Sequence, residues 1–136
     1  MANETCIFCD IVAGRVPCHK VWESDTHMAF LSIFPNTRGV TVVIPKAHTP
    51  SYVFDVPADQ VAALVESARV VAKILDKKLG NARTAVVFEG FGVDHLHAKL
   101  YPMHGTKSDS WEQKISHIDK FFTHYEGYIS SHECHK

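Results

Sequence analysis

Apolar side chains recur at intervals of three and four through residues 57–79, which form the longest periodic segment of the chain. The positions of this stripe are Val61, Leu64, Val65, Ala68, Val71, Ala72, Leu75 and Leu79. Such spacing is typical of an amphipathic helix that buries one side. Pro57 suits the first helical position, Asp59 favours the positive end of the helix dipole, and Gly80 is a typical residue at which a helix ends. We therefore predict one long helix over this segment.

The remaining apolar segments are short and lie between turn-forming residues. β-branched and aromatic side chains are frequent in them, as is usual in strands. They predict strands at residues 20–23, 27–34, 41–44, 84–88 and 93–102. The second of these is mostly apolar on both faces, so we expect it to be buried. Residues 6–13 instead predict a short helix that ends at Gly14.

The last predicted strand combines an apolar row with a basic row, because alternate side chains of a strand point to opposite faces. The apolar row is Leu96, Ala98 and Leu100, and the basic row is His95, His97 and Lys99. Neighbours in a row are ~7 Å apart, so one bound group can contact all three basic side chains. Two imidazoles and an ammonium repel one another when charged, so folding alone gives no reason for them. The alternative is the solvent-exposed polar face of an ordinary amphipathic strand.

At 136 residues the chain has the size of a single domain. Strands cluster on either side of one long helix in the sequence, which favours an α+β fold: an antiparallel sheet with that helix on one face. Residues 111–128 carry a weaker helical pattern with several aromatic side chains. Because exposed aromatics are unfavourable, we interpret this segment as a docked, partly helical C-terminal extension.

The formal net charge of −1 gives no bulk attraction to nucleic acid or to an anionic membrane surface. No apolar run approaches the ~20 residues that a membrane helix needs. Residues 1–5 lack the basic and apolar regions of a signal peptide. We therefore expect a cytoplasmic protein that binds neither nucleic acid nor membrane.

Cys6 and Cys9 form a Cys-x-x-Cys pair within the predicted short helix. Residues three apart share one face of a helix, and thiolates at this spacing are common zinc ligands. A closed zinc site needs two further ligands. Two alternatives stay open, namely buried free thiols and a redox-active pair. Cys18 and Cys134 are assigned no role.

Three sequence blocks occur in an order that is typical of one known family. They are Cys-Ile-Phe-Cys-Asp-Ile-Val-Ala-Gly-Arg-Val-Pro at 6–17, Val-Ile-Pro-Lys-Ala-His at 43–48 and His-Leu-His-Ala-Lys-Leu at 95–100. On these blocks, residues 4–104 resemble the histidine triad (HIT) superfamily, and the first block is most similar to its Hint-like branch. Residues 105–136 form an extension to this core. The resemblance implies a five-stranded antiparallel sheet with one long and one short helix. It also implies a homodimer in which two sheets join, with nucleotide sites on the joined surface.

The resemblance further implies a reaction. HIT proteins bind nucleoside phosphates and cleave the bond at the α-phosphorus of nucleoside phosphoramidates, acyl-adenylates or dinucleoside polyphosphates. His97 occupies the position of the nucleophile, whose neutral imidazole forms a nucleotidyl-imidazole that water then hydrolyses. His95, at the first motif position, orients a neighbour or holds a metal. This hypothesis requires the ring of residue 97 to lie uncovered on the outer face of the sheet, and a buried ring would leave only the architecture.

Four features depart from the family pattern. Lys99 stands where the third histidine belongs, so a fixed positive charge that can stabilise a phosphoryl group replaces a proton donor. Ser32 stands in place of a ribose-binding aspartate, and Val40 in place of a second active-site histidine. The loop at 88–92 is shorter than usual and lacks the usual amide and hydroxyl side chains.

The resemblance assigns nucleotide binding to a set of residues around this motif. They are Ile7, Phe8, Phe30, Ser32, Ile33 and Gly92. The apolar members correspond to base-binding positions, and the implied ligand is a purine nucleotide or nucleotide conjugate. Ordinary core packing is the alternative for the apolar members, and we favour it for Ile33.

HIT proteins with this N-terminal cysteine pair resemble zinc-binding members. In these, the histidine after the Ile-Pro-Lys strand and the first motif histidine complete the ligand set. The implied site therefore comprises Cys6, Cys9, His48 and His95. Four protein ligands leave no open position, so the zinc would be structural.

Three functional hypotheses follow. The first is a nucleotidyl hydrolase or transferase that works through a nucleotide bound to His97. The second is a nucleotide-binding or partner-binding HIT protein with weakened catalysis, which the departures from the motif favour. The third is a small redox or zinc protein without a nucleotide role, which depends on Cys6 and Cys9 alone.

Overall fold

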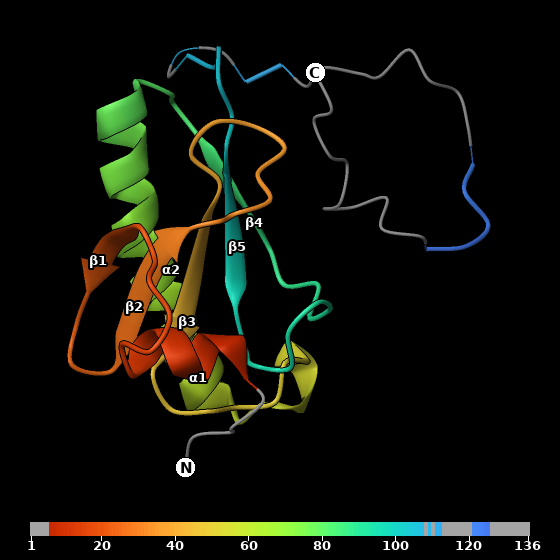
Figure 1. Cartoon of the computed structure of the whole chain (residues 1–136). Helices are drawn as coiled ribbons and strands as arrows, with labels where there is room; N and C mark the ends of the chain where they lie inside the picture. The colour runs from red at the N-terminus through yellow and green to blue at the C-terminus, as the bar shows by residue number, and fades with distance from the viewer. Residues whose placement is uncertain (1–5, 108, 110, 113–120, 126–136) are drawn as a thin grey trace.

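The computed structural model describes residues 6–107, 109, 111–112 and 121–125 (Figure 1). In chain order the elements are α1 (Ile7–Val12), β1 (Lys20–Glu23), β2 (His27–Leu31), β3 (Thr41–Pro45), the 3-10 turn η1 (Val53–Asp55), α2 (Ala58–Leu79), β4 (Thr84–Val87) and β5 (Ala98–Pro102). The strands form one five-stranded sheet in the order β1-β2-β3-β5-β4, and every neighbouring pair is antiparallel. The predicted α+β fold, with one long and one short helix, is confirmed.

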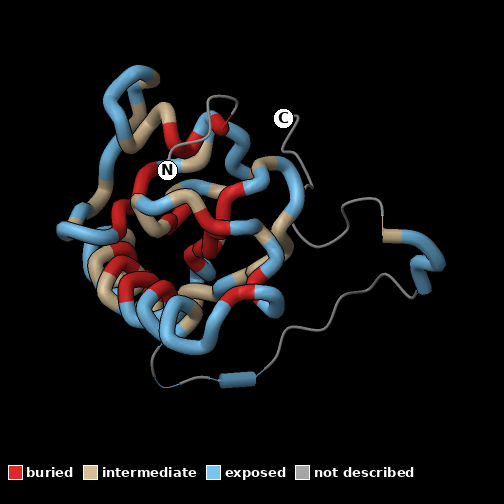
Figure 2. The backbone as a smooth tube through the Cα atoms, turned by 90° about the horizontal axis from the view of Figure 1, so that it is seen from below, coloured by how far each residue is buried: buried red, intermediate tan, exposed pale blue. Residues whose placement is uncertain are grey.

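The two helices lie on opposite faces of this sheet, with α1 across its front and α2 behind it in Figure 1. On the α2 face, Leu64 and Val71 pack against the strand residues Val43, Ala98 and Leu100. On the α1 face, a second and smaller cluster surrounds Phe8. Figure 2 shows the buried backbone concentrated between these layers.

The long helix α2 matches its predicted length almost residue for residue. Pro57 is the N-cap rather than the first helical residue, and the helix ends at Gly80, whose φ of 69° is in the left-handed region. The N–H of Gly80 donates to the carbonyl of Asp76 at 2.9 Å, which satisfies one of the free carbonyls at this end. Val65 was predicted in the buried stripe but is exposed. None of the described helices is long and apolar enough to cross a membrane.

Two predicted strands are too long by several residues, and the strand predicted at 84–88 ends one residue earlier, at Val87. The second ends at Leu31, and beyond it Ile33 is 80 % exposed, so the core packing favoured for Ile33 is wrong. The last begins only at Ala98, because the chain before it follows an irregular path in which the N–H of Leu96 donates to the carbonyl of Thr49 at 2.8 Å. The alternation of faces nevertheless continues through this irregular segment, since Leu96 joins the core beneath α2.

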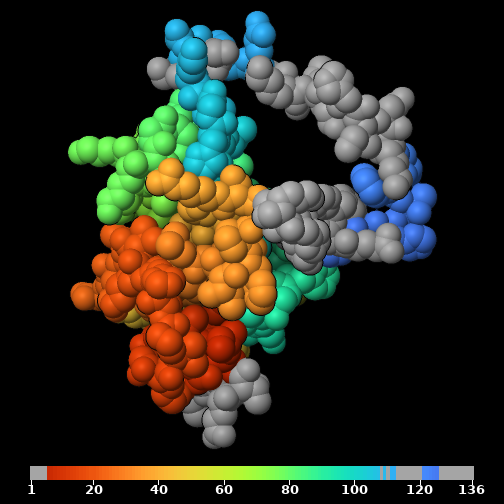
Figure 3. All heavy atoms as spheres, turned by 45° about the horizontal axis from the view of Figure 1, so that its top comes forward, coloured from red at the N-terminus to blue at the C-terminus, as the bar shows by residue number. Residues whose placement is uncertain are grey.

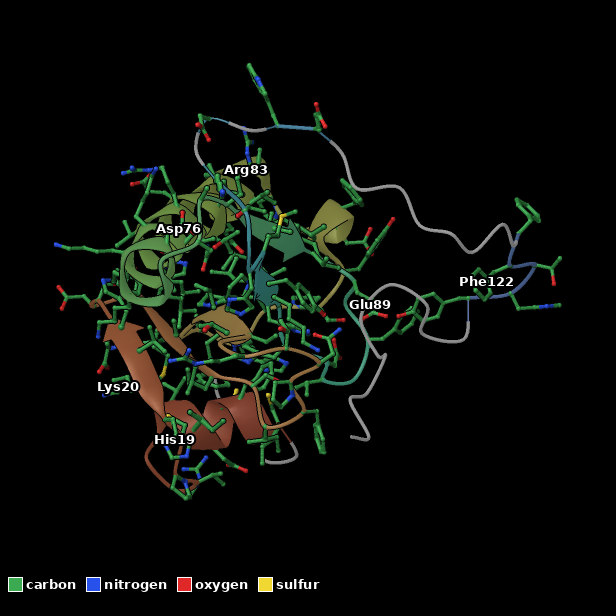
Figure 4. The ribbon with its side chains drawn as sticks, turned by 90° about the horizontal axis from the view of Figure 1, so that it is seen from above. His19, Lys20, Asp76, Arg83, Glu89 and Phe122 are labelled. Carbon is green, nitrogen blue, oxygen red and sulfur yellow. The ribbon has the colours of Figure 1, made fainter. Side chains whose placement is uncertain are left out.

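The expectation of buried aromatics in the C-terminal extension is wrong for the residues that the structure describes. Trp111 and Phe121 are both almost fully exposed, and residues 111–112 and 121–125 are not helical. The rest of the predicted helix lies outside the described residues. In Figure 4 the segment that carries Phe122 extends beyond the sheet and helices of the domain.

Candidate functional site

The basic row of the motif faces α1, opposite the apolar row. In the sheet, Lys99 pairs with Val42, which pairs with Phe30, so these three side chains form a line across the α1 face. His97 directly precedes β5, and its ring contacts Phe8, a member of the apolar cluster on the same face. In Figure 3 the red atoms near the N-terminus, which include α1, form one continuous surface with the orange atoms of the chain that follows. The predicted separation of the two rows is therefore confirmed.

The ring of His97 does not lie uncovered, and this expectation is corrected. The side chain is 8 % exposed, because Phe8 of α1 packs its ring edge-on at 5.3 Å between centroids. The same aromatic ring contacts His95 at 5.8 Å. The helix that carries Cys6 and Cys9 thus also covers both motif histidines, which the sequence pattern of the strand alone did not indicate.

One nitrogen of the His97 ring nevertheless reaches the surface. Nδ1 donates to the carbonyl of His95 at 2.7 Å, which fixes the tautomer and leaves the lone pair on Nε2. Nε2 has no hydrogen-bond partner among the described residues. The only unpaired side-chain N and O atoms there that are sealed from solvent are Oδ1 of Asn36 and Oδ1 of Asn81. The small exposed area of His97 therefore includes the nitrogen that can act as a nucleophile.

Burial lowers the pKa of His97 below its ordinary value, and the positive charge of Lys99 lowers it further. The hydrogen bond to the carbonyl of His95 and the carboxylate of Glu89 counteract this in part. Glu89, labelled in Figure 4, lies in the loop between β4 and the motif. The net result is a neutral imidazole at neutral pH, which is the form that attacks an electrophile.

Cys6, Cys9, His48 and His95 come together at the end of α1 nearest the motif, where these four residues could hold a metal ion. Cys6 is the N-cap of α1, and its Sγ accepts from the N–H of Cys9 at 3.4 Å. Nδ1 of His95 lies 3.4 Å from Sγ of Cys6 and 3.5 Å from Sγ of Cys9, and Nδ1 of His48 lies 3.3 Å from Sγ of Cys9. Burial raises the pKa of the Cys6 thiol, so a metal that binds there must displace a proton.

These separations fit the donor set of a tetrahedral zinc site. With Zn–S and Zn–N bonds of the usual lengths, a sulfur and a nitrogen ligand lie about 3.6 Å apart. Both imidazoles present Nδ1 to the sulfurs, and Nε2 of His95 donates to the carbonyl of Pro45 at 2.8 Å. A hydrogen bond of this kind orients a metal-binding imidazole and sets its tautomer. The sequence did not reveal the role of Pro45, because no side-chain pattern indicates which backbone carbonyl accepts a hydrogen bond from the second ring nitrogen of His95.

The residues assigned to nucleotide binding divide into two groups. Phe8 and Phe30 are buried and pack edge-on at 5.4 Å between ring centroids, so they belong to the apolar cluster beneath α1. Ile7 and Ile33 are exposed, and so is Gly92, whose φ of 93° suits glycine. The structure therefore leaves the second group available to a ligand.

The departures from the family pattern also have distinct surroundings. Val40 is fully buried, so its position contributes no surface to the site. Oγ of Ser32 accepts from the N–H of Phe34 at 3.1 Å, which occupies it within its own turn. Nζ of Lys99 lies 5.7 Å from the centre of the Tyr101 ring. Exposed Phe91 in the loop before the motif contacts Tyr125 of the extension at 5.4 Å, a contact that the sequence did not indicate.

The comparisons with known proteins agree with this fold and motif. A family model described as the HIT domain matches residues 13–105, and the chain belongs to the HIT family. It is 33% identical over 103 residues to an adenosine 5'-monophosphoramidase of Schizosaccharomyces pombe, which covers 72% of this chain and 74% of that relative. A crystal structure from Streptococcus mutans UA159 has a TM-score of 0.71 and 29% identity, covering 87% of this chain and 78% of that one. A zinc-bound histidine triad family protein from Mycobacterium smegmatis has a TM-score of 0.64 and 28% identity, covering 82% and 84%.

Proposed function

We propose that this HIT protein is a nucleotidyl hydrolase or transferase that acts at the α-phosphorus of a nucleoside phosphoramidate, acyl-adenylate or dinucleoside polyphosphate. The observation that carries the proposal is the state of His97: a neutral ring, its Nδ1 held by the carbonyl of His95, and its Nε2 open to the surface. Nucleophilic attack does not require the whole ring of His97 to be exposed, because one accessible lone pair is sufficient. We assign the chain to the Hint-like branch, with residues 4–104 as the catalytic domain.

The proposed reaction has two displacements. In the first, the lone pair of Nε2 of His97 forms a bond to the α-phosphorus, and the bond from phosphorus to the leaving nitrogen or oxygen breaks. The leaving group takes up a proton from solvent, since Lys99 in its charged form is a weak acid. In the second, water attacks phosphorus, the N–P bond breaks, and a nucleoside monophosphate and a proton are released. Lys99 stabilises the negative charge that the phosphoryl oxygens carry in both steps.

For the substrate, we infer a purine nucleotide conjugate. The relative from Schizosaccharomyces pombe is named for its action on an adenosine 5'-monophosphoramidate, which supports this class. Exposed Ile7 and Ile33 would contact the base, and Gly92 would let the backbone approach the phosphate. The hydroxyl hydrogen of Ser32 remains free to donate to a ribose oxygen.

We propose that Cys6, Cys9, His48 and His95 hold a structural zinc ion. The sulfur–nitrogen separations match a tetrahedral site, and the zinc-bound relative from Mycobacterium smegmatis supports the choice of metal. Bound zinc would tie α1 to the sheet and hold His95 in place. In turn, the carbonyl of His95 orients the ring of His97.

We also propose a homodimer in which the edge strand β4 pairs with its copy. β4 is the last strand of the sheet, and Val86 on it is exposed. An unprotected edge strand offers backbone donors and acceptors to another strand. The mass of the protein in solution, measured by light scattering, tests this: a monomer at micromolar concentration contradicts it.

The covalent intermediate is the sharpest test of the function. The protein is incubated with an adenosine phosphoramidate and examined by intact-protein mass spectrometry, where we expect a mass increase of one adenylyl group. His97→Ala should remove the adduct and lower turnover by at least about a thousandfold. The control is His19→Ala, because His19 is exposed and belongs to no part of the site (Figure 4). Unchanged turnover in the His97 variant would rule out its role as the nucleophile.

A second function is favoured by one observation. Fully buried Val40 takes the place of an active-site histidine, so the pocket around the phosphate has fewer polar groups than the family pattern provides. On this basis the protein binds nucleotides or a partner protein with little turnover. Nucleotide binding without adduct or turnover, across the same substrates, would favour this function over the first.

A further inference from the structure

A cavity of 560 Å³ lies at the end of the sheet where β3 stops and α2 begins. Its wall combines the end of β3 and the segment after it with the first turns of α2, including Gln60 and Ala63. His48 forms part of the wall, but His97, Lys99 and the residues proposed for nucleotide binding do not. The cavity is therefore a separate site, and its volume is within the range of ~300–1,000 Å³ that is typical for small-molecule ligands.

His27 contributes a buried polar group to this wall. Its side chain is 7 % exposed, and Nδ1 lies 2.8 Å from Oγ1 of Thr26. Nε2 has no hydrogen-bond partner among the described residues and is not one of the sealed unpaired atoms, so this nitrogen of a cavity-lining residue keeps some access to solvent. Burial lowers the pKa of His27, which keeps the imidazole neutral. In the tautomer whose Nδ1–H donates to Oγ1 of Thr26, Nε2 is an acceptor, and a ligand with an N–H group would select this tautomer.

The formal charge on the wall is negative. Asp55 is the only residue with a formal charge among those that line the cavity. Pro45, Pro50 and Pro57 also line it, and proline has no backbone N–H to offer. The N-terminus of α2 adds a positive potential, but the carboxylate of Asp59 in the first turn opposes it. An anion would therefore be repelled by the carboxylate of Asp55, whereas an ammonium group would be attracted to it.

We propose that this cavity binds a small organic molecule that carries a protonated amine on a compact apolar body. The ammonium group donates to the carboxylate of Asp55 and to Nε2 of His27, and charge-assisted bonds of this type are the stronger ones in proteins. The apolar body packs against the proline rings and against Ala63 and Leu96. The amide of Gln60 is available to a further polar group on the ligand.

The test uses phenethylamine as the probe, with 2-phenylethanol and 3-phenylpropanoate as neutral and anionic matches of similar size. Binding to the full chain is followed by NMR, with the imidazole signals of His27 as the local readout. We expect the amine to bind, and the anion to bind at least tenfold more weakly. Asp55→Asn should weaken amine binding at least tenfold. The matched control, Asp59→Asn, removes a charge from the same region but outside the cavity wall, and should change binding less than twofold.

A second variant keeps the proposal testable if Asp55→Asn does not fold. Ala63→Leu places a larger side chain in the cavity and should abolish binding of the amine, whereas Ala62→Leu, outside this cavity, should leave it intact. The proposal is overturned if the anion binds as well as the amine, if the two aspartate variants behave alike, or if Ala63→Leu binds as the unmodified chain does.

Discussion

The two faces of the sheet are built by alternate residues of the same strands, yet they differ in kind. The α2 face is closed by apolar contacts, with Leu64, Ala98 and Leu100 among its buried members. The α1 face buries thiols and imidazoles beside Phe8. Apolar groups gain from burial without further conditions, whereas buried polar groups need partners to offset the loss of water. The α1 face therefore carries groups that core packing alone does not explain.

The partners on the α1 face are specific. One ring nitrogen of each motif histidine donates to a backbone carbonyl: His95 donates to Pro45, and His97 donates to His95. The other ring nitrogen of each histidine keeps its lone pair for a metal or an electrophile. On the α2 face no comparable arrangement is needed, and a large number of similar apolar sequences could fill it. Substitutions on the two faces should therefore have different effects. Those on the α1 face should impair the proposed metal binding and activity, whereas those on the α2 face should lower stability through lost packing.

The largest effect on stability should come from the metal cluster. Cys9→Ser removes a ligand and leaves the three remaining groups buried around an incomplete site. If the four residues hold the proposed zinc ion, we expect this variant to lose it, together with more than about 4 kcal/mol of the free energy of unfolding. Elemental analysis gives the zinc content, and chemical denaturation gives the free energy.

Cys18→Ser is the matched control for this variant, because Cys18 is a half-buried cysteine that packs on the same cluster but lies outside the metal-binding group. It should retain zinc. If Cys9→Ser retains a full equivalent of zinc, or if Cys18→Ser loses as much, the four-ligand site is wrong.

An intermediate effect is expected on the α2 face. Leu100→Ala removes a fully buried side chain between β5 and α2. Such a truncation lowers the free energy of unfolding by about 2–5 kcal/mol. The space left by this truncation lies on the opposite face of the sheet from Cys9. Binding of the proposed zinc ion should therefore be unchanged. Val65→Ala, at an exposed position of α2, is the control and should cost less than about 0.5 kcal/mol. Loss of zinc from the Leu100 variant would show that the faces are not independent.

The α2 face is also the part of the fold that the sequence predicts best. A three-and-four periodicity describes a helix that packs on a flat apolar surface, and Gly80 marks its end because glycine readily takes the left-handed conformation. Strand limits were less accurate where loops begin inside apolar segments, as after Leu31. Ile33 continues the apolar segment of β2 but lies in the loop after it. The apolar pattern alone therefore does not reveal that its side chain is exposed.

The α1 face could be predicted only in part. The spacing of Cys6 and Cys9 and the alternation of the motif indicated which residues gather there, since both depend on local geometry. The cover over His97 depends on where α1 docks, which is a long-range contact between Phe8 and the motif. The carbonyl of Pro45 and the cavity wall beside His27 likewise come from chain segments that only the tertiary fold brings together.

The smallest expected effect lies outside both buried layers. Glu23 at the end of β1 accepts from Lys20 at 2.5 Å and from Lys46 at 2.6 Å, and these two partners lower the pKa of its carboxyl to about 2. Because the pKa in the unfolded chain is near 4.5, the stabilisation is fully present above pH 4.5 and is lost as the pH falls toward 2. The group is exposed, so the effect is small and falls as salt is added.

Comparison of the unmodified chain with Glu23→Gln isolates this contribution, because acid would also release the proposed zinc ion from both proteins. The difference in free energy of unfolding should be positive at pH 7 in low salt, smaller in high salt, and largely lost at pH 2, where the carboxyl of the folded chain is about half protonated. Glu66→Gln, which removes an exposed pair with Arg69 within one helix, is the control for a local ion pair. Lys46 follows β3 and precedes His48, so its ion pair with Glu23 also restrains the segment that carries this proposed metal ligand. A difference that persists unchanged at pH 2 would assign the effect of Glu23→Gln to something other than its charge.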